Sequence, residues 1–574
     1  MKTPAHTTRW NVLPRADQQK VENLKKGLGI DQNLCEMLVQ RGISTFEEAR
    51  TFFRPDLSQL HDPFLMADME AAVERILQAL GDGDRIMVYG DYDVDGTTSV
   101  AVVYSILRRV TEQVEYYIPN RYTEGYGLSK KGIDTAKKNG VSLIITLDCG
   151  VKAVELADYC AELGIDLIVC DHHRPGAVLP RAVAVLDPKR EDCAYPYKEL
   201  CGCGVGFKLM QALSMRGAFD FSVCMDYVDL VALAIGADIV PITGENRVLA
   251  ALGLEKINDN PGEGIRAILQ TANFKRTLSI SDVVFVIAPR INAAGRMETG
   301  NRAVELLVSS QEDLAALLSE TINGQNLQRR ELDQAITAQA LQMIQEDTTL
   351  MEAKTSVLFH PDWHKGVIGI VASRLTESYY RPTIILTESN GKATGSARSV
   401  KGYDVYNAIE ACSDLLDQFG GHAFAAGLTL PVENIEPFRS KFEEVVSATI
   451  RPEQLIPEIE IDLEIDFADI TPRFYAVLKQ MAPFGPGNMN PVFITRNCIN
   501  AGYSKTVGSN HLKFHVCQTS KPGVTMNGIG FGLGAYYPEV ADGQPFSMVY
   551  TVEENEFNGR TSLQLKVKDI RFEL

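Results

Sequence analysis

"RIMVYGDYDVDGTTS", residues 85–99, places three aspartates directly after a short apolar segment. The first six residues predict a buried strand, and "TTSVAVVYSILRRV" (97–110) predicts the helix that follows it. Asp91, Asp93 and Asp95 lie in the turn between them. Carboxylates at this spacing repel one another and resist joint desolvation, so a fold gains no stability from clustering them. The turn is either a cation site or an ordinary acidic loop, and the rest of the chain decides between the two.

The pattern of an apolar strand followed by an acid recurs downstream. Further strands are predicted in "SLIITLDCG" (142–150), "DLIVCDHH" (166–173) and "AVAVLDP" (182–188). "MDYVDLVALAIGADIVP" (225–241) predicts a buried helix that ends near Asp238. Apolar strands that alternate with helices are typical of a parallel sheet covered on both faces. The fold class predicted for this region is therefore α/β.

The 574 residues are too many for one hydrophobic core and predict several domains. Residues 302–346 favour helix and contain one glycine and no proline, which suits a long helix joining two lobes. A second α/β segment follows, and the short strand-like pieces at the C-terminal end predict an oligonucleotide-binding (OB) β-barrel. The expected regions are a helical N-terminal region (1–75), a parallel-sheet domain (76–255), a helical connector (256–346), a second α/β domain (347–452) and the barrel (453–574).

The net charge of −18 argues against a nucleic-acid partner, because phosphate binding needs a basic surface. The charge is unevenly distributed, however: residues 472–537 contain no acid, six lysines or arginines and nine aromatic residues. Aromatic side chains among basic ones are typical of a surface on which single-stranded bases stack. The alternative is that these aromatics form the core of a small β-domain, which is the commoner case for each residue taken singly.

Composition argues against several other classes of protein. Hydrophobic residues make up 45% of the chain and charged residues 23%, as in an ordinary globular protein. The N-terminus lacks the apolar core of a secretory signal, and no stretch has the ~18 apolar residues that span a membrane. The eleven cysteines are scattered, so we expect reduced thiols in a cytoplasmic protein, with no zinc site. The Walker phosphate-binding signature is absent, which argues against a nucleotide-driven motor.

Functional residues of open parallel sheets gather at the carboxyl ends of the strands. The three aspartates of the first turn, Asp148, the triplet Asp171-His172-His173 and Asp238 all follow a predicted strand or buried helix. Carboxylates with one or two imidazoles suit Mn2+ or Mg2+, and this many candidate ligands favours two ions over one. Taken singly, such an aspartate is more often a helix cap and such a histidine pair an ordinary surface dipeptide. An EF-hand calcium loop lacks its closing acid here, so the combination favours a two-metal site.

These motifs resemble those of the DHH phosphoesterase superfamily in both residues and order. Its four metal motifs are similar to "GDYDVDG" (90–96), "LDCG" (147–150), "DHH" (171–173) and "GADIVP" (236–241). The stretches that resemble its RecJ branch are "PNRYTEGYG" (119–127), "APRINAAGRM" (288–297), "HKGVIGIVASRL" (364–375), "GSARS" (395–399) and "FGGHAFAAG" (419–427). The resemblance extends from about residue 50 to the C-terminus.

The resemblance implies a 5′-to-3′ exonuclease that hydrolyses single-stranded DNA by two-metal catalysis, in DNA repair and recombination. It implies that residues 76–255 are a DHH domain, 347–452 a DHH-associated domain and 453–574 an OB-fold domain that binds nucleic acid. Two Mn2+ or Mg2+ ions are the implied cofactors. Single-strand-binding protein and a helicase are the implied partners, although no docking surface is recognisable in the sequence, and no membrane partner is expected.

Carried over by position, the resemblance also implies which residues form the site. The implied metal ligands are Asp91, Asp93, Asp95, Asp148, His172 and Asp238. The implied catalytic residues are Asp93, Asp95, Asp148, His172, His173 and His422. Among them, His173 is a metal ligand or a phosphate contact, and His422 faces the scissile phosphate from the second lobe. Tyr89 stands where several superfamily members have a histidine, four residues before Asp93, so the sequence leaves open whether Asp91 takes over a coordination position.

A phosphate pocket is implied as well. Arg121, Ser396 and Arg398 resemble residues that hold the 5′-terminal phosphate, while Asn292 and Arg296 are weaker candidates for strand contacts in the cleft. Arginine forks match phosphate oxygens, and a serine hydroxyl adds a neutral donor. Without the surrounding motifs, Arg121 and Arg398 would be read as surface salt bridges.

Two other functions remain open. A DHH phosphodiesterase for short oligonucleotides or cyclic dinucleotides needs only two α/β lobes, so the additional regions at both ends of this chain count against it. A non-catalytic single-strand-binding scaffold is the second, since some DHH relatives have lost metal ligands. The full set of acids argues against a scaffold, because an idle site would gain stability by losing clustered carboxylates.

Overall fold

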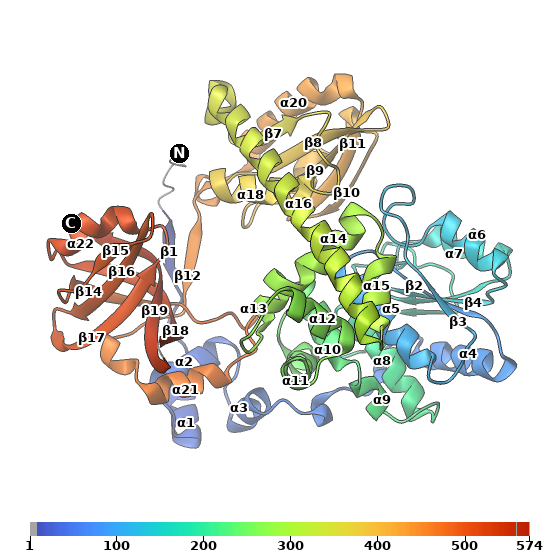
Figure 1. The fold of residues 1–574 in the computed structure, drawn as a ribbon, viewed down its shortest axis with the longest axis horizontal. Helices are drawn as coiled ribbons and strands as arrows, with labels where there is room; N and C mark the ends of the chain where they lie inside the picture. The colour runs from blue at the N-terminus through green and yellow to red at the C-terminus, as the bar shows by residue number, and fades with distance from the viewer. Residues whose placement is uncertain (1–7, 558, 573–574) are drawn as a thin grey trace.

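Figure 1 shows the computed structural model, which describes residues 8–557 and 559–572. Its three large sheets form three lobes: a parallel sheet on the right of the view, a mixed sheet at the top and a barrel on the left. One long helix, α16 (Glu312–Glu346), runs from the parallel-sheet lobe to the upper lobe. Within the described ranges, no helix is long and apolar enough to cross a membrane. The predicted fold class is confirmed.

The parallel sheet that carries the acidic motifs has the strand order β3-β2-β4-β5-β6, and every pairing in it is parallel. Its strands are β2 (Ile86–Gly90), β3 (Val114–Tyr117), β4 (Leu143–Leu147), β5 (Asp166–Cys170) and β6 (Ala184–Leu186). The helices that cover it are α4 (Met69–Asp82), α5 (Val94–Leu107), α6 (Lys130–Lys138), α7 (Val154–Glu162), α8 (Gly202–Met215), α9 (Ser222–Met225) and α10 (Val228–Ala237).

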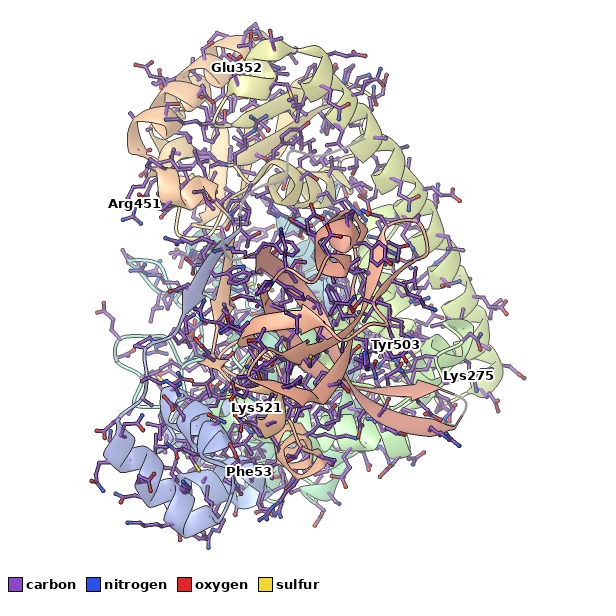
Figure 2. The ribbon with its side chains drawn as sticks, turned by 90° about the vertical axis from the view of Figure 1, so that its left-hand side faces the viewer. Phe53, Lys275, Glu352, Arg451, Tyr503 and Lys521 are labelled. Atoms are coloured by element: carbon purple, nitrogen blue, oxygen red, sulfur yellow. The ribbon has the colours of Figure 1, made fainter. Side chains whose placement is uncertain are left out.

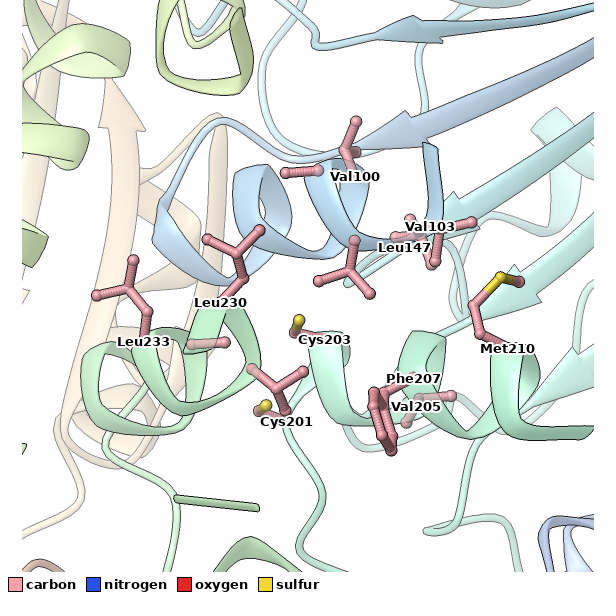
Figure 3. Packing of buried hydrophobic residues seen from close by; sticks show 14 of the residues in the cluster. Val100, Val103, Leu147, Cys201, Cys203, Val205, Phe207, Met210, Leu230 and Leu233 are labelled. Carbon is pink, nitrogen blue, oxygen red and sulfur yellow. The ribbon is translucent and has the colours of Figure 1, made fainter. Parts of the chain in front are cut away.

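Alternate residues of each strand in this sheet enter two different cores. Ile86 packs among residues of α5, α8 and α10, whereas its neighbour Met87 packs on the opposite face among residues of α6 and α7. Side chains of a strand alternate between faces, so both faces must be apolar when helices cover both. Figure 3 shows Val103 of α5 and Leu147 of β4 packed beside α8, which carries Cys203. All eleven cysteines are buried free thiols, as predicted.

The connector is a series of helices rather than one. It comprises α11 (Gly244–Asp259), α12 (Glu263–Thr271), α13 (Ile280–Asp282), a π-helical segment (Val283–Ile287), α14 (Ala288–Met297), α15 (Asn301–Val308) and α16. The prediction of one continuous helix over 302–346 is wrong at its start, because the chain leaves the helix between Val308 and Glu312. There the Ser309 hydroxyl accepts from the Gln311 N–H (3.3 Å) and donates to the Gln311 carbonyl (3.2 Å). A serine that satisfies backbone groups locally competes with helical hydrogen bonds.

The upper lobe has a five-stranded sheet of order β10-β11-β9-β8-β7, in which only the β7–β8 pair is parallel. Its strands are β7 (Ser356–Phe359), β8 (Thr383–Ser389), β9 (Lys392–Arg398), β10 (Gln418–His422) and β11 (Ala425–Leu430). Its helices are α17 (Thr348–Glu352), α18 (Ile368–Tyr379), α19 (Val405–Glu410) and α20 (Ile435–Thr449). Ile336, Ala340 and Ile344 of α16 share a core with α18, which couples the connector to this lobe.

The C-terminal lobe is a barrel of seven strands in the order β13-β14-β18-β19-β17-β16-β15, and β14 also pairs with β16. The strands are β13 (Leu463–Glu464), β14 (Phe493–Asn500), β15 (Lys505–Val507), β16 (His511–Gln518), β17 (Lys521–Gly530), β18 (Phe546–Phe557) and β19 (Arg560–Phe572). The nine aromatics of the acid-free run range from fully buried to largely exposed. Phe474, Phe493 and Phe514 are buried in the core, whereas Tyr503 is 77% and Phe531 60% exposed. The core interpretation is thus confirmed for three of them, and two remain free to meet a ligand.

The N-terminal helices pack against this barrel. Val21 of α1 (Gln18–Leu28) and Leu34 of α2 (Gln32–Gln40) belong to the barrel's own core cluster. β1 (Arg9–Val12) pairs in parallel with β12 (Glu458–Ile461), just before the barrel. Figure 2, in which the barrel faces the viewer, shows Phe53 at the end of α3 (Phe46–Phe53) below Lys521 of the barrel.

Arg247 of α11 ties the barrel and the N-terminal helices to the parallel-sheet lobe. Its guanidinium donates to the carbonyls of Phe52 (3.0 Å), Met481 (3.0 Å) and Ala482 (2.9 Å). The carbonyl of Pro486 also accepts from the Ile242 N–H at 2.7 Å. With the Pro483 carbonyl (3.3 Å), this buried guanidinium has four backbone acceptors, which fix the orientation of its neighbours, so these contacts hold the barrel against the first lobe.

Candidate metal centre and phosphate pocket

Acids and histidines of the parallel-sheet lobe meet where its strands end. Asp91 follows β2, Asp148 follows β4, and the triplet that begins with Asp171 follows β5. Asp93 caps the N-terminus of α5, where its Oδ1 accepts from the Gly96 N–H at 3.0 Å. Asp238 ends α10, the buried helix predicted from its apolar run. The expectation that these loops share one rim of the sheet agrees with the structure.

His172 lies at the centre of the carboxylates. Its Nε2 is 3.1 Å from Asp148 Oδ1, 3.6 Å from Asp238 Oδ2 and 3.8 Å from Asp95 Oδ2. Among the described residues, neither this nitrogen nor Asp148 Oδ1 makes a hydrogen bond, although both atoms are buried. The pKa of His172 is lowered to about 3, mainly by burial and to a smaller extent by the charge of His173, so the imidazole is neutral. A neutral buried imidazole whose nitrogen faces carboxylates is a donor set that fits a cation.

Two overlapping groups have donor atoms within 4.8 Å of one another: Asp148, His172 and His173 form one, and Asp95, His172 and Asp238 the other. Carboxylate oxygens with imidazole nitrogens form the donor set of Mn2+ and, with fewer imidazoles, of Mg2+. Burial and neighbouring acids raise the pKa of Asp95 to about 7 and that of Asp238 to about 8. Cations would relieve this repulsion, so the residues present fit a divalent metal centre.

Asp171 orients His172 and His173 through hydrogen bonds. It accepts from the backbone N–H groups of Val151 (2.9 Å), His172 (2.8 Å) and His173 (3.1 Å). Its Oδ1 also lies 2.8 Å from His173 Nδ1. Burial opposes ionisation, yet the bond to His173 and that residue's charge lower the pKa of Asp171 to about 2, while the pKa of His173 is raised. Carboxylates that hold metal-site histidines in this way fix the ring orientation.

Asp95 and Asp91 are held by backbone amides. The two oxygens of Asp95 accept from the N–H groups of Gly202 (2.7 Å) and Cys203 (2.8 Å) at the start of α8. A Cβ on Gly202 would lie 2.5 Å from the Asp148 Cβ, so only glycine admits this close approach. Asp91 Oδ1 accepts from Gly127 N–H at 3.3 Å, while its buried Oδ2 has no partner.

Tyr89 points away from the metal centre. Its hydroxyl donates to the Gly127 carbonyl at 3.0 Å and lies 3.3 Å from Ser129 Oγ, while its ring stacks on Tyr117 at 5.2 Å. Gly127 is the residue whose N–H reaches Asp91. Tyr89 therefore supports the segment that positions Asp91 and does not occupy a ligand position itself.

Three arginines gather beside the metal centre. Arg398 donates to Ser396 Oγ (3.0 Å) and to the Ala397 carbonyl (2.7 Å). Arg296 donates to the Gly366 carbonyl at 2.9 Å, and Arg121 lies 4.9 Å from the centre of the Tyr92 ring. Within the described residues none of the three arginines has a carboxylate at ion-pairing distance. The salt-bridge alternative is therefore wrong for Arg121 and Arg398.

The like charges of these arginines act on one another. Burial, with the charge of Arg121, lowers the pKa of Arg398. Burial, with the charges of Arg121, Arg329 and Arg398, lowers the pKa of Arg296 to about 9. Asn292 lies next to them, in a cavity of about 190 Å³ that Arg296 and Arg329 also line. Guanidinium groups without counterions, with a serine hydroxyl among them, form an anion pocket.

The candidate phosphate pocket takes residues from two lobes and from the connector. Ser396 and Arg398 lie on β9 of the upper lobe, and Arg121 follows β3 of the first lobe. Arg296 belongs to α14, which approaches the acidic turn so closely that a Cβ on Gly295 would lie 2.5 Å from the Tyr92 carbonyl oxygen. Glycine at that position lets the helix bring Arg296 to the metal centre.

His422, the predicted catalytic residue of the second lobe, lies at the end of β10 and is exposed. Burial, with the positive charges of Lys152, His173 and Lys189, lowers its pKa. These three residues belong to the parallel-sheet lobe, so His422 faces that lobe across the cleft. No hydrogen bond joins its ring to another described residue.

Sequence reasoning missed three residues of the site. His364 lies beside Tyr122 and Gly366. The pKa of His364 is lowered mainly by burial and, to a smaller extent, by the charge of Arg121. Arg329 belongs to the arginine group through α16. Asp187 follows β6 and is buried with one unpartnered oxygen, and burial raises its pKa to about 7. The strand-end rule applied to "AVAVLDP" identifies Asp187, whereas Arg329 carries no local signal.

Comparisons with known proteins agree with this architecture. Family models match residues 85–235 (DHH family, N-terminal domain), 351–448 (DHHA1 domain) and 461–569 (RecJ OB domain). The single-stranded-DNA-specific exonuclease RecJ of Bacillus subtilis is 37% identical over 98% of this chain and 71% of its own. The Escherichia coli RecJ is 34% identical over 88% of this chain and 90% of its own.

A solved structure is similar across almost the whole chain. The crystal structure of Thermus thermophilus RecJ in complex with Mn2+ has a TM-score of 0.85 at 27% identity, covering 99% of this chain and 80% of that one. The same protein in complex with Mg2+ gives a TM-score of 0.79. The domain order, the acidic strand ends and the identity over nearly the full length lead to one conclusion: the chain belongs to the RecJ family of the DHH phosphoesterases.

Proposed function

We propose that this chain degrades single-stranded DNA stepwise from its 5′ end, with Mn2+ or Mg2+ as cofactor. One observation carries the proposal: a cluster of buried carboxylates and histidines lies directly beside arginines that have no carboxylate partner among the described residues. Each group is costly by itself, and each is matched by one part of a 5′-phosphorylated strand with its metals. The RecJ relatives named above are single-stranded-DNA-specific exonucleases, which agrees with this chemistry.

Two divalent cations would be held at the ends of the parallel strands. The proposed ligands are Asp91, Asp93, Asp95, Asp148, His172 and Asp238, with His173 at the edge of the site. When bound, such ions polarise water for attack on phosphorus and neutralise charge on the phosphoryl oxygens. Asp95, held by two backbone amides, and His172, held in its neutral form, present fixed donor atoms, so little reorganisation is needed.

The phosphate pocket determines where the strand is cut. Arg121, Ser396 and Arg398 would hold the terminal phosphate, and Arg296 and Asn292 would contact the strand beside it. A strand end fixed there places its first linkages at the adjacent metal centre, which favours removal of short products from the end. A 5′-phosphate has two negative charges and three free oxygens, which suits several guanidinium groups.

Two histidines, His173 and His422, are proposed to donate hydrogen bonds to the phosphate of the bound strand. Asp171 raises the pKa of His173, so we propose that His173 is an imidazolium that donates to a phosphoryl oxygen. The lowered pKa of His422 leaves that ring neutral, able to donate one hydrogen bond to the phosphate from the opposite lobe. Both act on the strand between the lobes, where a single strand has to lie.

The cellular setting is also part of the proposal. Eleven buried free thiols suit the reducing cytoplasm, where we place the enzyme. Single-strand-binding protein and a helicase are the proposed partners, because a cleft built for a strand end depends on other proteins to expose one. Tyr503 and Phe531, both exposed on the barrel, are the aromatics proposed to stack on the strand.

The test uses 3′-labelled, 5′-phosphorylated single-stranded DNA with Mn2+, Mg2+ or chelator. Blunt duplex and a cyclic dinucleotide are the competing substrates, and Asp158→Ala, a change at an exposed acid, is the control. Stepwise shortening of the single strand alone, lost with chelator and in Asp148→Ala, is the expected result. Cleavage of only the dinucleotide, or strand binding without hydrolysis in any metal, would overturn the proposal.

A further inference from the structure

Phe285 is the most exposed phenylalanine near the cleft, with 76% of its surface accessible. It belongs to the π-helical segment Val283–Ile287, which continues directly into α14. Asn292 follows seven residues later, about 10 Å along the helix axis. Short π-helical turns are frequent at functional sites, and an aromatic ring so exposed adds little to the core. The segment therefore presents a ring to solvent close to the phosphate pocket.

A basic hollow of about 550 Å³ lies on one side of Phe285. We call it the basic bowl, and its charged residues are Lys275, Arg276, Arg290 and Arg330. Among the described residues, Arg276 alone of these four has an acidic partner, Asp282. Arg290 donates to two neutral acceptors, Asn323 Oδ1 (3.1 Å) and the Val286 carbonyl (2.6 Å). Its pKa is lowered mainly by burial and, to a smaller extent, by the charge of Arg330.

Lys275 and Arg330 are exposed, and among the described residues neither has a carboxylate at ion-pairing distance. The chain as a whole carries a net charge of −18, so acids are plentiful elsewhere. A group of cations left unmatched on an acidic protein is an electrostatic footprint for an anion.

Phe285 also lines an apolar groove of about 780 Å³. Ile239 of the first lobe and Met489, which lies between β13 and β14 of the barrel, line this groove and are each 63% exposed. Val284 lines both the groove and the cavity that holds Asn292 and Arg296. Val284 is thus a shared wall, and the groove adjoins the cavity of the proposed strand-binding residues.

We propose that Phe285, the basic bowl and the apolar groove together bind single-stranded DNA a few nucleotides 3′ of the terminal phosphate. The proposal rests on the proposed function, since it takes the same strand as its ligand. Phosphates lie in the basic bowl, one base stacks on the ring of Phe285, and neighbouring bases lie on the apolar side. A single strand has charge on one edge and aromatic surface on the other, which matches a basic bowl and an apolar groove that both adjoin Phe285.

The experiment measures affinity for 5′-phosphorylated strands of two lengths, about 2 and about 20 nucleotides, in chelator so that no cleavage occurs. Phe285→Leu keeps an apolar side chain but removes the ring, Phe285→Trp keeps a ring, and Phe46→Ala is the control at another exposed phenylalanine. We expect Phe285→Leu to bind the long strand about tenfold more weakly, with Phe285→Trp and the control unchanged. Affinity for the short strand stays the same in every variant.

The charges are tested by salt dependence. For the long strand, the Lys275→Ala, Arg330→Ala double variant is expected to reduce the slope of log affinity against log salt by about 1.4, two contacts at about 0.7 each. An unchanged slope, or equal losses on both lengths, would overturn the inference. So would Phe285-dependent binding of an acidic peptide without Phe285-dependent binding of the strand. Hydrolysis of the short strand in Mn2+ tests the proposed function separately, because that substrate does not reach Phe285.

Discussion

The metal centre and the phosphate pocket are adjacent sites of opposite charge that are built in different ways. The carboxylates and His172 come from strand ends and helix ends of a single lobe, and backbone amides hold Asp95 and Asp171 in place. The pocket takes Arg121 from one lobe, Arg398 from the other and Arg296 from the connector.

The difference separates chemistry from positioning. A centre built on one sheet keeps its geometry whatever the lobes do, since the parallel strands set the spacing of its ligands. A pocket assembled from three parts exists only when those parts are correctly arranged, so α16 and α14 are as necessary to it as its arginines. Loss of a metal ligand should therefore abolish cleavage of every substrate, whereas loss of a pocket arginine should change which ends are cut.

The largest effect is expected for Asp148→Asn. The amide removes a charged donor atom beside His172, and hydrolysis of single strands should fall by more than about a thousandfold in Mn2+. The metal-free variant should melt at a higher temperature than the metal-free wild type, because burial and neighbouring acids raise the pKa of Asp148 and the amide relieves both. Single-turnover rates and thermal melts check the two effects. A variant that is both inactive and less stable would contradict the assignment.

Asp171→Asn should have a smaller effect of about 10–100-fold on rate, since Asp171 supports the histidines without being a ligand. The pKa of His173 should fall when its carboxylate partner is lost. Because the proposed role of His173 needs the protonated ring, the variant's activity should decline at a lower pH than that of the wild type as the pH is raised. Asp158→Asn, at an exposed pair with Arg181, is the matched control. An unshifted profile would mean that His173 does not titrate in the reaction.

The pH dependence of stability provides a third comparison. The pKa of Asp95 is raised to about 7 and that of Asp238 to about 8, against an unfolded value of ~3.9. The folded state thus binds protons more tightly than the unfolded state, and the free energy of unfolding should fall as pH rises from about 4 to about 8. Bound Mn2+ should remove this loss and add about 2.7 kcal/mol at 100 times its Kd. Denaturant titrations of metal-free protein whose stability rises over this pH range would contradict the burial of the acids.

Tyr89→Phe should have the smallest effect on cleavage. Its hydroxyl bonds the Gly127 carbonyl, so its loss should cost about 1–2 kcal/mol of stability while the Kd for Mn2+ changes less than about threefold. Chemical denaturation and Mn2+ titration measure the two quantities. A tenfold weaker Kd with unchanged stability would show that Tyr89 acts on the metal rather than on the loop.

Sequence reasoning predicted the metal centre better than the pocket, for a physical reason. The ends of parallel strands share one edge of a sheet, so Asp91, Asp148 and Asp171 could be placed together from the apolar runs before them. Asp187 obeys the same rule and was missed because a lone acid before a proline reads as a turn. Arg121 and Arg398 are far apart in the chain, and only the family resemblance brought them together.

The fold shows the same division between local and tertiary information. Buried strands and the helix α10 were predictable because their apolar patterns are local. The break after Val308 depends on one serine hydroxyl, and the packing of the N-terminal helices on the barrel depends on contacts 400 residues apart in the chain, such as that of Arg41 with Asp462. Neither has a periodic signal in the sequence.

The most direct test compares cleavage of 5′-phosphorylated and 5′-hydroxyl single strands by the wild type, Arg398→Ala and the control Arg50→Ala, an exposed arginine on α3. If the arginines hold the terminal phosphate, Arg398→Ala should lose about 100-fold on phosphorylated ends and little on hydroxyl ends, with Mn2+ affinity unchanged. Equal losses on both ends, or a loss of Mn2+ affinity, would contradict the division between a metal centre that cleaves and a pocket that selects the end.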